Sequence, residues 1–79
     1  MTALLNKVSE LIDLEILREQ AKAVARKRAV FICQTMSADQ WDAAADVEIE
    51  LIAPNVKDAF AKQIKSAIEI TRWFKTRRH

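Results

Sequence analysis

The chain of 79 residues contains no glycine, one proline and one histidine. Glycine supplies the positive φ angles of tight hairpins and of loops that wrap around phosphate groups. Its absence excludes a P-loop, a dinucleotide-binding fingerprint and a glycine-flanked nucleophile elbow in their usual forms. A single proline leaves little to interrupt helix formation. The sequence therefore predicts an all-α protein of one domain, near the lower size limit for a single core.

Side chains for catalysis and metal binding are scarce as well. His79 is the last residue of the sequence, and chain ends are usually mobile. The one cysteine, Cys33, lies in an apolar run, which predicts a buried free thiol in a reducing compartment. Cysteine and histidine do not occur at zinc-binding spacing. We therefore expect no enzymatic activity, no cofactor and no metal site.

Long hydrophobic runs are missing too. The longest uncharged run is Ala29 to Ala38, ten residues, whereas a membrane-spanning helix needs about 20. Residues 1–12 lack the basic start of a signal peptide and contain Lys7 and Glu10. These features predict a cytoplasmic protein without a transmembrane segment.

Residues 2–36 contain no helix breaker and form the first predicted helix. As one rod this helix would be about 50 Å long. On a helical period its apolar residues fall on two faces about 150° apart. The first face comprises Leu4, Leu5, Val8, Leu11 and Ile12, and the second Leu14, Leu17, Ala21, Val24, Ala25, Phe31 and Ile32. Either the helix breaks near Asp13, or it is long and its second face meets another chain, which predicts a homodimer.

The second helix is predicted over residues 38–53. Ser37 and Gln40 have the spacing of a capping box, with Met36 and Trp41 at the positions of a hydrophobic staple. This pattern makes Trp41 a structural residue. The helix ends before Pro54, which disfavours helix in the residue ahead of it. Residues 47–51 alternate as a strand would, but the chain has no second candidate strand with which to pair.

The third helix is predicted over residues 56–76, after Asn55 as its cap. Its apolar stripe is Val56, Phe60, Ile64, Ala67, Ile70 and Phe74. Phe74 is therefore predicted to be core. Trp73 lies about 100° from the stripe, so we expect it to be exposed. Trp73, Arg72 and Arg77 are candidate partner-binding residues, because tryptophan and arginine are enriched at binding hot spots.

Charge is segregated along the chain. Residues 37–54 carry five acidic and no basic side chains, and residues 55–79 carry seven basic and two acidic ones. The spacing of Asp39, Asp42, Asp46 and Glu50 places them on one ridge of the second helix. This ridge is either a solvated face beside basic helices, a surface offered to a basic partner or, as a third alternative, a divalent-metal site. Glu48 lies on the apolar side, so we expect a basic residue of another helix to meet it.

These observations favour a helical bundle of three helices, or four if the first one breaks, completed by homodimerisation. The leading functional hypothesis is a non-enzymatic protein that binds another protein stoichiometrically, as a regulator, inhibitor or adaptor. The alternative is nucleic-acid binding through the basic C-terminal helix. A second helix that carries only acidic charge argues against the usual helix-turn-helix arrangement. A third hypothesis is peripheral membrane association through the same basic, amphipathic C-terminal helix.

Overall fold

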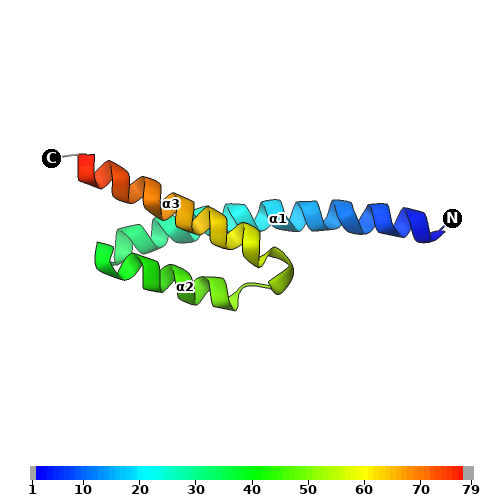
Figure 1. The fold of residues 1–79 in the computed structure, drawn as a ribbon, viewed down its shortest axis with the longest axis horizontal. Helices are drawn as coiled ribbons and strands as arrows, with labels where there is room; N and C mark the ends of the chain where they lie inside the picture. The colour runs from blue at the N-terminus through cyan, green and yellow to red at the C-terminus, as the bar shows by residue number, and fades with distance from the viewer. Residues whose placement is uncertain (1, 78–79) are drawn as a thin grey trace.

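A computed structural model describes the backbone of residues 2–77 and the side chains of residues 13–76. Three α-helices follow one another: α1 (Thr2–Thr35), α2 (Trp41–Leu51) and α3 (Lys57–Arg77). Short 3₁₀ turns at Ala38–Gln40 and Pro54–Val56 precede α2 and α3. Figure 1 shows α2 running back along α1, and α3 returning across both. The predicted all-α fold is confirmed, and no strand occurs among the described residues.

α1 is one continuous helix. It passes Asp13 without interruption, so the alternative of a break near that residue is wrong. Its amino-terminal part extends beyond α2 and α3 (Figure 1). The molecule consequently measures 61 × 22 × 14 Å, with a radius of gyration of 15.9 Å, whereas a compact chain of this length has about 12 Å. The first predicted apolar face, Leu4 to Ile12, lies outside the residues whose side chains are described.

The core lies where α1 packs along α3, with α2 closing one side. α1 contributes a row of alanines one turn apart, Ala21, Ala25 and Ala29, followed by Ile32. Small side chains in such a row let two helix backbones approach closely. The other fully buried large side chains are Trp41 of α2 and Phe60, Ile64 and Ile68 of α3. The second predicted face of α1 is therefore divided between the core and solvent.

Trp41 has the predicted structural role. Its ring is fully buried, and its Nε1 donates a hydrogen bond to the carbonyl oxygen of Met36 at 3.0 Å. The cations of Arg72 and Lys75 lie 5.6 and 4.9 Å from the centroid of the Trp41 ring, within cation–π range. Trp41 thus joins the α1–α2 connection to the end of α3.

The predicted caps are wrong in detail. The Ser37 side chain makes no capping hydrogen bond. Instead the carbonyl oxygen of Ser37 accepts a hydrogen bond from the backbone amide of Gln40 at 2.9 Å. This bond forms a 3₁₀ turn, and α2 begins only at Trp41. Asn55, predicted as the cap of the third helix, lies inside the second 3₁₀ turn, whose N-cap residue is Ala53. Both connections use backbone hydrogen bonds in a tight turn where the sequence pattern predicted side-chain caps.

The buried stripe of α3 also differs from the predicted one. Ile68 is completely buried, whereas Ile70 and Phe74 are 54% and 58% exposed. Phe74 as a core residue is therefore wrong. The reason is the direction of α3: its C-terminal part diverges from α1 (Figure 1), so residues on the α1 side of that part have no helix against which to pack. The burial ends with Ile68, which follows Phe60 and Ile64 at four-residue spacing.

Candidate binding surfaces

The C-terminal part of α3 carries an exposed apolar cluster, Ile70, Trp73 and Phe74, which we call the α3 tip. Trp73 is 51% exposed, as expected for a residue outside the core. The Trp73 and Phe74 rings meet edge to face, with centroids 5.0 Å apart and planes at 77°. This is a preferred aromatic geometry, so the two rings support each other while most of the cluster faces solvent.

Arg72, predicted as a partner-binding residue, contributes to the fold. Its Nη1 donates to the Glu69 carboxylate at 2.9 Å, and its Nη2 lies 3.4 Å from both Asp42 Oδ2 and the Ala38 carbonyl oxygen. These contacts and its position over Trp41 tie α3 to the start of α2. Its role toward a partner stays a prediction. Arg77, the second predicted arginine, has a side chain outside the described ones.

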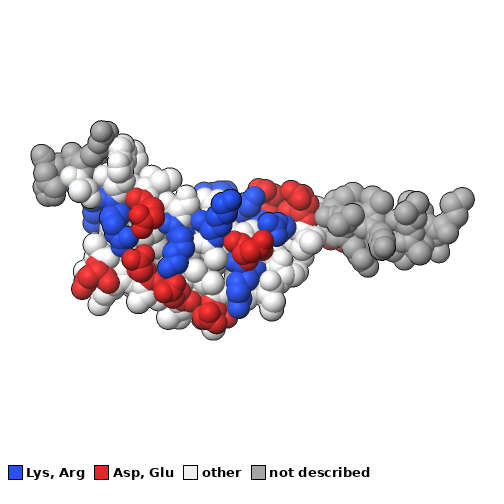
Figure 2. All heavy atoms as spheres, in the orientation of Figure 1, with Lys and Arg blue, Asp and Glu red and all other residues white. Residues whose placement is uncertain are grey.

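Three members of the predicted acidic ridge, Asp42, Asp46 and Glu50, lie on α2, and Asp39 lies in the 3₁₀ turn before it. Figure 2 shows acidic side chains in the region of α2 beside basic ones. Two of its four members form ion pairs with α3: Asp42 with Arg72 at 3.4 Å, and Asp46 with Lys65 at 2.7 Å. Asp39 and Glu50 are exposed, and neither makes an ion pair with another described side chain. The geometry favours the interpretation of a solvated ridge beside a basic helix. Exposed pairs of this kind contribute about 0–1 kcal/mol each.

Glu48 has the basic partner that its position predicted. Its Oε1 accepts a hydrogen bond from Nε of Arg28 on α1. The Glu48 side chain is only 19% exposed, so the pair removes the cost of an unpaired carboxylate between two helices. The Arg28 guanidinium also lies 4.5 Å from the centroid of the Phe31 ring.

An apolar surface surrounds this ion pair. A hollow of about 170 Å³ between α1 and α2 is lined by Val24, Arg28, Glu48, Leu51, Ile52 and Phe60. Val24 and Leu51 belong to a larger set of exposed apolar side chains on the two helices, which we call the α1–α2 strip: Leu17, Val24, Phe31, Val47 and Leu51. Leu51 is 80% exposed. The sequence predicted the α1 members as a face that meets another chain, but not the α2 members, whose alternation resembled a strand.

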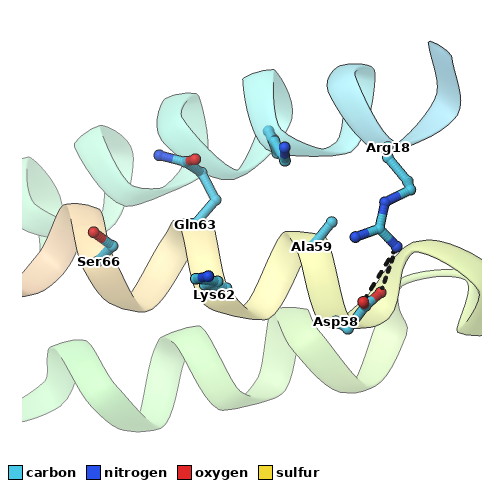
Figure 3. A pocket seen from close by; sticks show the side chains of 7 residues that line it. Arg18, Asp58, Ala59, Lys62, Gln63 and Ser66 are labelled. Carbon is cyan, nitrogen blue, oxygen red and sulfur yellow. Dashed lines mark hydrogen bonds and ion pairs between the residues drawn. The ribbon is translucent and has the colours of Figure 1, made fainter. Parts of the chain in front are cut away.

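A polar cleft of about 400 Å³ lies between α1 and α3 (Figure 3), lined by Arg18, Lys22, Asp58, Ala59, Lys62, Gln63 and Ser66. At one end Arg18 Nη1 donates to both carboxylate oxygens of Asp58, at 3.1 and 3.2 Å. The backbone amide of Ala59 and the Arg18 side chain lower the pKa of Asp58. Sequence analysis did not identify this cleft, because Arg18 and Asp58 are 40 residues apart.

Within the described residues, no group of three or more His, Cys, Asp or Glu side chains is arranged to hold a metal ion. Cys33 is a free thiol, half-buried rather than buried as predicted. None of the described helices is both long enough and apolar enough to cross a bilayer.

Comparison with known proteins gave no match: no family model, no curated protein and no solved structure is significantly similar to this chain.

Proposed function

We propose that this protein acts without catalysis, by binding stoichiometrically to a larger protein through the α3 tip. The observation that carries the proposal is the exposure of Ile70, Trp73 and Phe74, each more than half accessible on neighbouring turns beyond the core. Clustered exposed apolar residues mark interaction sites more often than chance positions do. The exposed Lys75 adjoins the two aromatic residues in the sequence. The matching partner surface is an apolar pocket, because the Lys75 cation lies over the Trp41 ring of the fold itself.

Affinity purification from the native host, followed by a measured Kd for the captured protein, tests this proposal. Trp73→Ala should weaken binding by about 2 kcal/mol, or roughly thirtyfold, the scale of a hot-spot residue. Ile16→Ala is the control, because Ile16 is equally exposed, on α1; its Kd should not change. Equal binding by the wild type and Trp73→Ala would refute the role of the tip.

We further propose that the α1–α2 strip is covered by a second copy of the chain. Leu17 and Phe31 lie seven residues on either side of Val24. In two antiparallel α1 helices related by a two-fold axis at Val24, Leu17 of each copy would therefore stand opposite Phe31 of the other. Such self-complementarity is what an isologous dimer interface requires. A second copy would cover Val24 and the neighbouring Leu51 together, since both line the same hollow.

Light scattering tests the dimer. The wild type should have twice the 9.0 kDa mass of one chain, and Val24→Lys should reduce the mass to that of one chain because it places two like charges at the axis. Val30→Lys is the matched control: Val30 is also exposed on α1 but lies about 120° from Val24. A wild-type mass of 9.0 kDa at micromolar concentration, or dissociation by the control, would refute this interface.

The two alternative functions have weaker support. Nucleic-acid binding through the C-terminal helix would lack two of the cations of that helix, because Lys65 and Arg72 are paired with α2 carboxylates. Membrane association would use the same aromatic tip. Flotation with anionic vesicles distinguishes membrane binding from protein binding by the tip. Co-flotation of the wild type, but not of Trp73→Ala, would favour membrane association.

A further inference from the structure

The polar cleft between α1 and α3 is built from two pairs of residues that face each other. α1 supplies Arg18 and Lys22, and α3 supplies Asp58 and Lys62, each pair being one helical turn apart. Arg18 and Asp58 bind each other across one end of the cleft (Figure 3). The next turn therefore brings two lysines, Lys22 and Lys62, to the same cavity without a carboxylate between them.

The charges in this cleft are not balanced by the protein. Three cations and one carboxylate line it, a formal charge of +2. Lys22 pairs with Glu19 of its own helix, an exposed contact at 3.2 Å, and Lys62 makes no ion pair with any side chain among residues 13–76. Like charges that share a cleft repel each other, and an anion placed between them would remove this repulsion. Glu19 offsets one of these charges, and the positive charge that remains favours an anion in the cleft.

Neutral donors complete the cavity. Figure 3 shows the Gln63 side chain extending from α3 toward α1, with Ser66 further along α3. The amide of Gln63 and the hydroxyl of Ser66 can each donate a hydrogen bond. Ala59, which also lines the cleft, is buried and small, so it leaves space between the charged walls. We propose that this cleft is a binding site for a small phosphate-type anion, held by Lys22 and Lys62, with Gln63 and Ser66 donating to its remaining oxygens.

Titration with inorganic phosphate at constant ionic strength, followed by backbone amide NMR, tests this site. The wild type should bind saturably, with the largest shifts in residues 18–22 and 59–66. Lys62→Gln should weaken phosphate binding by about tenfold, the loss of one charge-assisted contact. Lys57→Gln is the matched control, because Lys57 is a lysine of the same helix that does not line the cleft; its phosphate affinity should stay within about twofold of the wild type, a change well below that of one lost contact.

Lys62 is exposed, so its replacement should leave the thermal unfolding of the protein in phosphate-free buffer unchanged, and a loss of binding can then be assigned to the site. Non-saturable shifts in the wild type, or equal weakening by Lys57→Gln and Lys62→Gln, would overturn the proposal. Because neither residue belongs to the α3 tip or the α1–α2 strip, this result is independent of the partner-binding experiments.

Discussion

Replacing Ile68 and Ile70 by alanine tests the orientation of α3 with one chemical change at two positions of the same helix. Ile68 is completely buried and Ile70 is 54% exposed. A buried Ile→Ala substitution costs about 2–5 kcal/mol, because it loses transfer free energy and leaves a cavity. For Ile70, about half of the side chain is already in water, and full burial of such a side chain is worth about 1.5–3 kcal/mol. We therefore expect about 1 kcal/mol for Ile70→Ala.

Urea unfolding followed by circular dichroism measures both losses. A domain of this length has a total stability of about 4–12 kcal/mol, so Ile68→Ala removes a large part of it. In thermal unfolding, the Ile68→Ala variant should melt at least about 10 °C below the wild type. If Ile68→Ala does not fold, Ile68→Val should still cost about 0.5–1.5 kcal/mol.

The refuting result is equal destabilisation by the two alanine substitutions, measured at a concentration where the chain is monomeric. It would mean that the stripe through Ile70 and Phe74 is buried and that α3 is rotated from the orientation described here. Phe74→Ala provides a second check, with an expected loss of about 1 kcal/mol for a side chain that is 58% exposed.

Three further outcomes follow from the contacts. Ser37→Ala should cost less than about 0.5 kcal/mol in thermal unfolding, since the hydroxyl makes no cap; a loss near 1 kcal/mol would restore the capping box. A double-mutant cycle on Arg28 and Glu48 should give a coupling of about 0.5–1 kcal/mol, and zero coupling would contradict the ion pair. The pKa of Asp58 is lowered, so its ionised form stabilises the fold above the unfolded pKa of about 3.9. The stability difference between wild type and Asp58→Asn should therefore be constant near neutral pH and shrink as the pH falls below about 4; a difference independent of pH would contradict it.

Features determined by local sequence could be predicted. The absence of glycine and the position of Pro54 led to an all-helical chain with connections near Ser37 and Pro54. The apolar surroundings of Glu48 predicted its basic partner, because a carboxylate on the buried side of a helix needs one. Trp41 was identified as structural from its place beside the helix boundary, and its hydrogen bond to Met36 is local, whereas the two cations over its ring, Arg72 and Lys75, come from residues far away in the chain.

Features determined by the crossing of helices could not be predicted. In α3, Ile68 and Ile70 belong to two overlapping stripes, and only the direction in which α3 leaves α1 decides which stripe is buried. Likewise, the α1–α2 strip and the polar cleft each combine residues from two helices. A helical period gives the faces of one helix but not the neighbour that each face meets.

The alanine row of α1 also limits which substitutions the fold can accept. Ala21, Ala25 and Ala29 are buried within the packed helices, and a larger side chain there would force overpacking at about 1–3 kcal/mol. Glycine would cost about 1 kcal/mol through its poor helix propensity. Both larger and smaller residues are therefore disfavoured at these three positions, while exposed positions of the same helix outside the α1–α2 strip can vary widely. Divergent descendants of this sequence should therefore be recognised by three alanines at four-residue spacing more readily than by overall similarity.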